Sequence, residues 1–417
     1  MKTYRIIILI SVFTLIFTGL VQADDWPEWR GPRRDAICKE TGLLKEWPEG
    51  GPELLMTIED LGKGFSSPSI SKGVIYITSM YDNEEYISAF ELDGTPKWKT
   101  KYGKAYTKSF PDARSTPTVD GDYVYVISGT GEVVCLDTDG EIKWSVPGYE
   151  KFEGKYGAWG VAESPLIVDN KVIYTPCGDK TTVVAMDKMT GETVWMSETL
   201  NDQSGYVSPL LVEIGDLKLI VTVTGTYIIG VNADNGNIEW KIVYKDIPEE
   251  GKGGDINIPT PVYHDGGIFV TSGYNHTGVM LELSDDGKSA KPVWVNPDLD
   301  THHGGVVLVD GYIYGSNWIN NGNGNWLCLD WESGKTMYDT KWHNKGSILA
   351  AEGMLYCYEE AKGNLGLVKA TPDEFALVSS FRIEKGSAQH WGHPVISDGK
   401  LYIRHGDVMM VFDVKAK

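Results

Sequence analysis

Basic, imidazole, amide and aromatic side chains recur just before the prolines that punctuate this sequence about every 50 residues. These candidates are Arg114, Tyr206, Asn257, His302, His303, His390 and Trp391. Arginine binds carboxylate or phosphate groups, aromatic faces stack on sugar rings, and histidine makes binding sensitive to pH. If these side chains meet in space, they predict a site for a small polar ligand, such as a sugar or an organic anion, or for a peptide partner.

Further candidates lie beside the same prolines or in predicted hairpins. They are Trp159, Glu163, Asn317, Trp318, His393, Arg404 and His405. Structural roles remain open for several of them. Arg114 and Glu163 would satisfy each other as a buried ion pair between neighbouring units, and Trp318 and Trp391 would plug a channel.

The histidines raise the question of a metal site. His302 and His303 are adjacent, and His390 and His393 are three residues apart in an extended segment. Neighbouring residues on a strand point to opposite faces, so each pair is expected to face apart. Metal ligation therefore needs partners from other parts of the chain, and hydrogen-bonded channel lining remains the alternative.

The candidates must be positioned by a repeated unit, which is clearest at residues 162–195. This stretch predicts four short strands, at 166–168, 172–175, 183–186 and 193–195, separated by turn residues such as Asp169-Asn170 and Thr190-Gly191. Eight imperfect copies are recognisable. A proline enters the first strand at Pro68, Pro117, Pro165, Pro209, Pro261 and Pro394, with Val306 and Leu349 in its place in two copies. An aromatic residue marks the last strand at Trp98, Trp144, Trp195, Trp240, Trp294 and Tyr338.

A four-stranded sheet cannot bury both of its faces, but copies stacked around an axis can. The sequence therefore predicts an all-β fold, an eight-bladed β-propeller of four-stranded antiparallel blades. The last copy ends without a fourth strand, and residues 51–58 resemble the missing one. We expect this N-terminal strand to complete the last blade and close the ring. Residues 24–50 are expected to form an irregular arm across a single propeller domain, residues 51–417.

The two faces of such a disc are expected to differ. One is built from short turns such as Asp120-Gly121, Asp265-Gly266 and Asp398-Gly399. The other carries the segments between blades and the hairpins between second and third strands, which hold the candidates above. Because binding groups gather on loops of a rigid scaffold, we expect the site at the channel mouth on this second face.

Composition places further limits on function. Residues 1–23 have basic residues, an apolar run and a Val21-Gln22-Ala23 end typical of a signal peptide, which predicts a periplasmic or secreted protein. A net charge of −20 disfavours nucleic acid and anionic membranes as partners. No later stretch is long and apolar enough to predict a membrane span. Cys135 and Cys328 occupy equivalent strand positions and are expected to be buried single thiols, and we expect a monomer.

The repeat Ala185-x-Asp187-x-x-Thr190-Gly191-Glu192-x-x-Trp195 resembles the tryptophan-docking repeat of the pyrroloquinoline quinone (PQQ) propellers. The resemblance covers residues 52–414. It implies the propeller fold and two alternative functions: a PQQ- and Ca²⁺-dependent oxidoreductase acting on an alcohol or sugar, or a protein-assembly scaffold. The whole-chain pattern, including His302-His303-Gly-Gly and His390-Trp391-x-His393-Pro, is similar to exported bacterial PQQ-binding-like proteins.

The sequence departs from the quinoprotein dehydrogenases in several places. Those enzymes carry a vicinal Cys-Cys beside the quinone, and this chain has none. Glu163, Asn257 and Asp255 match a hard-cation site only by residue type. The sequence therefore favours ligand binding at the channel mouth over the oxidoreductase and the scaffold, and it assigns no catalytic residue.

Overall fold

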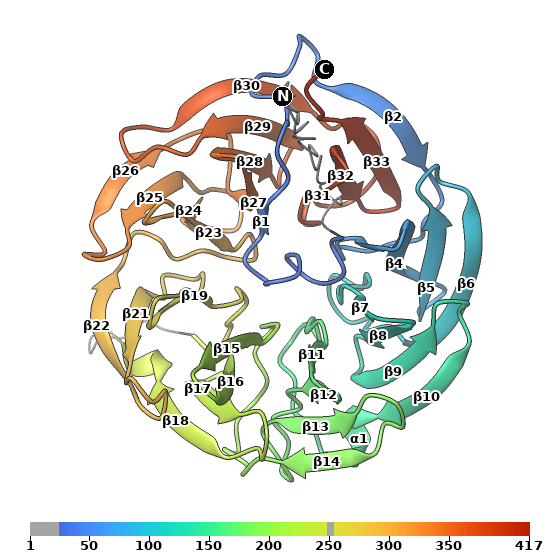
Figure 1. Ribbon diagram of the computed structural model, residues 1–417, viewed down its shortest axis with the longest axis vertical. Coiled ribbons are helices and arrows are strands. Elements are labelled where there is room, and N and C mark those ends of the chain that lie inside the picture. The colour runs from blue at the N-terminus through green and yellow to red at the C-terminus, as the bar shows by residue number, and fades with distance from the viewer. Residues whose placement is uncertain (1–24, 248–253) are drawn as a thin grey trace, which may run out of the picture.

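The structure, a computed structural model, describes residues 25–247 and 254–417, so the predicted signal peptide lies outside the described residues. Eight sheets of antiparallel strands surround a central axis (Figure 1). The predicted eight-bladed propeller is confirmed. None of the helices in the described ranges is long and apolar enough to cross a membrane.

Each blade runs from an inner to an outer strand in chain order, except that the outer strand of the eighth blade comes from the N-terminal region. The first four blades are β3–β6 (Ser69–Ser71, Val74–Tyr81, Glu84–Glu91, Pro96–Lys104), β7–β10 (Thr118–Asp120, Tyr123–Ile127, Glu132–Asp137, Ile142–Pro147), β11–β14 (Leu166–Val168, Lys171–Tyr174, Val184–Asp187, Thr193–Met196) and β15–β18 (Leu210–Ile214, Leu217–Val223, Tyr227–Asn232, Ile238–Val243). The fifth and sixth are β19–β22 (Val262–His264, Gly267–Val270, Gly278–Leu283, Ala290–Asn296) and β23–β26 (Val306–Val309, Tyr312–Ser316, Trp326–Asp330, Thr336–Thr340). The seventh and eighth contain β27–β30 (Gly346–Ala351, Met354–Glu359, Asn364–Lys369, Ala376–Arg382) and β31–β33 (Val395–Ser397, Lys400–His405, Val408–Asp413). A short helix, α1 (Gly148–Lys151), and a 3₁₀ turn, Tyr244–Asp246, lie in connections.

The core lies between neighbouring blades rather than inside any one of them. Tyr125 and Trp144 of the second blade pack with Val172 and Val184 of the third in one buried cluster. Outer strands such as β10 alternate buried and exposed residues, because only one of their faces meets a neighbour. This arrangement explains why a single repeat would not be stable alone.

Five outer strands carry a tryptophan, and each of these tryptophans docks onto the next blade, as the motif predicts. Trp144 Nε1 donates a hydrogen bond to the Lys188 carbonyl at 3.0 Å, and Trp195 Nε1 donates to the Ala233 carbonyl at 3.0 Å. Gly191 has a φ of +72°, and a Cβ there would lie 2.8 Å from the Trp144 ring. The Thr-Gly turn of one repeat is therefore shaped to receive the indole of the repeat before it.

The ring is closed by β2 (Glu53–Ile58), which pairs antiparallel with β33 in the eighth blade. The predicted strand 51–58 is thus confirmed as the missing fourth strand. One feature was not expected: β1 (Ile37–Cys38) pairs parallel with β27 and adds a fifth strand at the inner edge of the seventh blade. Cys135 and Cys328 are buried single thiols.

The N-terminal arm, residues 25–50, crosses the centre of the ring (Figure 1) and is bonded to every blade. Its contacts with the eight blades, in chain order, are Trp26 with Ile70, Pro27 with Val119, Arg34 with Pro165, Arg34 with Pro209, Trp29 with Thr260, Arg30 with Val306, Ala36 with Ala350, and Glu40 with Gly399. Glu40 reaches the Asp398-Gly399 turn, whereas Arg34 reaches the opposite ends of the inner strands. The arm therefore enters the channel from the short-turn face, reaches nearly through it, and returns.

Candidate functional site

A cavity of about 460 Å³ lies at the end of the channel where the segments between blades meet. Its lining comes from the arm, from the connections between blades and from the second-to-third-strand hairpins. The lining residues used below are Trp29, Phe65, Phe110, Arg114, Trp159, Tyr206, Tyr274, His302, His303, Glu360, Trp391 and His393. A volume of this size fits a small organic molecule.

Aromatic rings make up much of the wall. Trp391 lies at the centre of this group, with ring-centroid distances of 4.8 Å to Phe65, 5.1 Å to Phe110 and 4.8 Å to His303. Trp159 and Tyr206 form an edge-to-face pair at 5.8 Å. Such walls bind flat or ring-shaped ligands, because they offer a large apolar area with little loss of side-chain freedom.

The apex of the arm, the part that contains Trp29 and Arg34, closes the channel below the cavity. Trp29 lies 4.5 Å from the His393 ring, and its Nε1 donates to Thr260 Oγ1 at 2.9 Å. Arg34 is buried, pairs with Glu28 at 2.6 Å and donates to inner-strand carbonyls, including that of Pro209 at 2.8 Å. Trp29 therefore belongs to a floor that is fixed by hydrogen bonds to several blades.

Arg114 brings a positive charge to the cavity. Its Nη2 donates to the carbonyls of Ser109, at 3.0 Å, and of Phe110, while Nη1 is buried without a hydrogen-bond partner among the described residues. Burial lowers the pKa of Arg114 from its usual value. No ion pair joins Arg114 to Glu163 in the part of the chain that the structure describes. Arg114 therefore lines the cavity and keeps one unused hydrogen-bond donor, Nη1.

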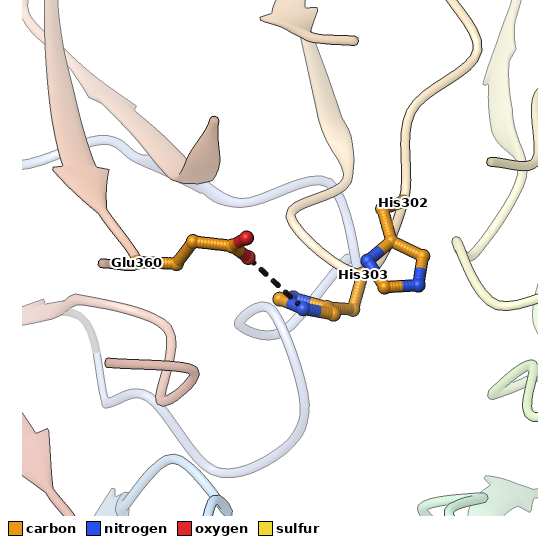
Figure 2. A group of neighbouring side chains, drawn as sticks. All are labelled: His302, His303 and Glu360. Atoms are coloured by element: carbon orange, nitrogen blue, oxygen red, sulfur yellow. Dashed lines mark ion pairs between the residues drawn. The ribbon is translucent and has the colours of Figure 1, made fainter. Parts of the chain in front are cut away.

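Two histidines and a carboxylate from neighbouring blades face one another at one side of the cavity (Figure 2). His303 Nε2 lies 3.1 Å from Glu360 Oε2, and Lys345 Nζ lies 2.6 Å from Glu360 Oε1. Burial raises the pKa of Glu360, but His303 and Lys345 outweigh it and keep the pKa below its ordinary value. Burial, together with the charges of His303 and Lys345, holds the pKa of His302 well below its usual range, so His302 is neutral.

The cavity brings together Arg114, Trp159, Tyr206, His302, His303, Trp391 and His393 from the sequence-derived candidates. Trp318 lies at its margin, where its ring packs against Tyr274 at 4.9 Å. Asn317 instead organises its own hairpin: it donates to the Asp298 carbonyl and accepts from Asn325 N.

The other candidates lie inside the protein with partners of their own. Arg404 is fully buried and donates to Ser66 and Thr78 of the first blade. His390 and His405 stack at 3.6 Å, with Tyr358 bonded to His390 and backbone carbonyls bonded to His405. Asn257 Nδ2 donates to the carbonyls of Thr224 and Gly225. Glu163 accepts two hydrogen bonds from Thr175.

Several cavity residues were not among the candidates. Phe65 and Phe110 carry no polar group that would mark them in a sequence. Trp29 belongs to the arm, and nothing local in the sequence shows that the arm reaches this cavity. Glu360 lies in the hairpin between β28 and β29, beside Glu359. What distinguishes Glu360 is its contact with Lys345 and His303, which are 15 and 57 residues earlier in the chain.

The donors around the cavity do not fit the Ca²⁺ and PQQ pair that the resemblance implies. Ca²⁺ prefers about six to eight oxygen ligands, usually with several carboxylates. Glu360 is the only carboxylate among the described lining residues, and Lys345 already neutralises it. Glu163 does not line the cavity. Burial also raises the pKa of its carboxyl group to about 8, so this group is protonated at neutral pH.

A model of the family described as outer membrane protein assembly factor BamB matches residues 83–340. Among solved structures, BamB from Moraxella catarrhalis is similar with a TM-score of 0.64 and 15% identity, over 87% of this chain and 99% of that one. The quinohemoprotein alcohol dehydrogenase from Comamonas testosteroni is similar with a TM-score of 0.67 and 13% identity, over 94% and 81%. A europium-containing methanol dehydrogenase reaches 0.66 and 13%, over 92% and 90%. At these identities the structures show the shared fold alone. No curated protein matches the chain in sequence.

Proposed function

Because this chain belongs to the family of PQQ-repeat β-propellers described as outer membrane protein assembly factor BamB, we propose that it uses the channel mouth of that fold to bind a small organic anion. The ligand carries a ring, of an aromatic acid or a sugar acid, and an anionic group. The N-terminal segment 1–23 supports a periplasmic or secreted site of action.

The observation that carries the proposal is the unsatisfied Nη1 of Arg114. Buried polar atoms nearly always have a hydrogen-bond partner, and a charged donor is costly to bury without one. The group lies in a wall of aromatic rings that offers stacking surface. A carboxylate on Arg114 with the attached ring against Trp391 or Trp159 would satisfy both features.

The test is a calorimetric titration of the protein with glucuronate, galacturonate and benzoate-type acids, with the corresponding neutral sugar or amide as the matched ligand. Carboxylates are expected to bind saturably, and their neutral counterparts at least about 10-fold more weakly, since a hydrogen bond to a charged group contributes about 1.5–3 kcal/mol. Arg114→Gln is expected to remove that preference without changing the melting temperature by more than a few degrees.

Arg382→Gln is the matched control, because Arg382 is an exposed arginine on an outer strand. Equal binding by Arg114→Gln and the unmodified protein would overturn the proposal. Saturable binding of PQQ with Ca²⁺, accompanied by dye-linked alcohol oxidation, would instead favour the oxidoreductase. A propeller that binds none of these ligands would favour the scaffold function.

A further inference from the structure

Three buried polar atoms on neighbouring residues share the same unusual state. His302 Nδ1, His303 Nε2 and Glu360 Oε2 all lack a hydrogen-bond partner in the described structure. His303 Nε2 and Glu360 Oε2 lie 3.1 Å apart as an ion pair, and neither atom has another partner among the described residues. Single orphaned atoms occur in many folds, but three in one cluster indicate a shared absent partner.

From this arrangement we infer that His302, His303 and Glu360 bind one divalent transition-metal ion, of the Zn²⁺ or Cu²⁺ type, through these three atoms. One ligand atom from each of the three residues lies within 4.8 Å of the others. Two ligands bound to one ion at about 2.1 Å and near a right angle lie roughly 3 Å apart, which matches the separation of His303 and Glu360. Ligand atoms on one ion lie roughly 3.4 Å apart at a tetrahedral angle, so the third ligand, His302, needs to move inward by up to about 1.4 Å.

The other polar atoms of the cluster are already held in place. Tyr274 OH lies 3.1 Å from His302 Nε2, which leaves Nδ1 directed toward His303. Lys345 holds Glu360 Oε1 and is itself fixed by the carbonyls of Asn320, at 3.0 Å, and Asn321, at 2.9 Å. The His303 carbonyl lies 2.9 Å from His393 Nε2. Such outer contacts orient the ligands of metal sites.

The backbone explains how adjacent histidines come to face the same point. They lie in the connection between β22 and β23 rather than on a strand, so the alternation of a strand does not apply. Their ring centroids are only 4.4 Å apart. The expectation that the two rings would face apart is therefore wrong.

The donor types select the class of metal. Two imidazoles and one carboxylate suit Zn²⁺, Cu²⁺, Ni²⁺ or Fe²⁺, whereas Ca²⁺ and Mg²⁺ prefer oxygen ligands. Lys345 offsets the charge of Glu360, so a bound ion would keep most of its positive charge and attract a further anionic ligand from the cavity. The metal site itself does not depend on the organic ligand proposed above.

The experiment is a titration of tag-free, chelator-treated protein with ZnCl₂ and, separately, CuSO₄, followed by calorimetry, with Cu²⁺ electron paramagnetic resonance as a second readout. One ion per chain is expected, with nitrogen hyperfine structure from two imidazoles. His303→Gln and Glu360→Gln are each expected to weaken binding about 100-fold. CaCl₂ is expected to give no saturable binding at this site.

His264→Gln is the matched control, because His264 is an exposed histidine outside the cluster. It is expected to leave affinity unchanged. If Glu360→Gln fails to fold because Lys345 loses its partner, His303→Gln still decides the question, since His303 is partly exposed. Absence of saturable binding, or equal affinity in His303→Gln and His264→Gln, would overturn the inference.

Discussion

Glu163 is a buried carboxyl that accepts hydrogen bonds from the backbone N and the side-chain Oγ1 of Thr175. Burial raises its pKa to about 8, against an ordinary value of 4.5, although the Thr175 hydrogen bonds act in the opposite direction. Between these two values the folded protein holds a proton that the unfolded chain releases. Unfolding is therefore favoured as the pH rises through this range, and the contribution of Glu163 to stability is greatest below about pH 4.5.

Glu163→Gln is expected to remove this dependence, because an amide fills the same space without titrating. Each unit of pKa corresponds to about 1.4 kcal/mol, and about three units lie between pH 5 and the raised pKa, so the variant is expected to gain roughly 4 kcal/mol relative to the unmodified protein between pH 5 and pH 8.5. Melting temperatures of both proteins across this range measure the effect. Parallel curves would show that Glu163 ionises normally in the folded state.

At the level of single residues, the sequence revealed chemical type better than location. Trp391 and Arg404 are equally noticeable as large side chains near repeat boundaries, yet one lines the cavity and the other is fully buried. The difference arises from the carbonyls of Ser66 and Thr78, which come from the opposite end of the chain. Partners this distant in sequence are not visible in any local pattern.

Among the elements, β32 and β4 show how the first and last blades are joined. Arg404 of β32 donates to Ser66 Oγ and to the Thr78 carbonyl, both at 2.6 Å. Burial lowers the pKa of Arg404 to about 10, which still leaves it charged at neutral pH. The junction between the last and first blades therefore contains a buried cation, Arg404, whose hydrogen bonds are accepted by oxygen atoms of Ser66 and Thr78.

Arg404→Met is expected to destabilise the protein by about 3 kcal/mol, because it leaves several buried carbonyls without donors. Chemical denaturation measures the change, and Arg382→Met provides an exposed comparison with an expected effect below about 0.5 kcal/mol. Anion and metal binding are expected to persist in the folded fraction of Arg404→Met. Loss of binding with unchanged stability would instead place Arg404 in the functional site.

The elements themselves were largely predictable because each repeat carries its own signals. Proline anchors, Asp-Gly and Thr-Gly turns and the outer tryptophan are local, and together they defined the blades and the closing strand β2. β1 was not predictable, since two residues paired parallel to β27 leave no periodic pattern. The conformation of the arm around Trp29 and Arg34 was not predictable either. It is fixed by hydrogen bonds to residues of distant blades, which leave no pattern in the arm's own sequence.

At the scale of the whole molecule, closure depends on the N-terminal region in two separate ways. β2 covers the edge of β33, and the arm preceding it crosses the centre of the ring. An uncovered strand edge is a template for pairing with another chain. The two contributions can be separated because β2 and the arm occupy consecutive, non-overlapping residues.

Two truncations test this separation. Deletion of residues 25–50 is expected to leave a folded monomer of lower melting temperature that has lost anion binding, because Trp29 and its hydrogen bonds form the cavity floor. Deletion of residues 25–58 is expected to produce oligomers or aggregates through the exposed β33 edge. Light scattering after size-exclusion chromatography distinguishes the outcomes, and a monomeric 25–58 deletion would show that closure does not require β2.

The bonding of the arm to all eight blades also sets an order of events during synthesis. The arm leaves the ribosome before any of the blades, but Arg30, Ala36 and Glu40 bind to blades that are translated last. It must therefore wait, without its final partners, until almost the entire polypeptide has been made. The pocket floor therefore reaches its final contacts only after the last blades have formed, so a chain that ends before them lacks a complete floor.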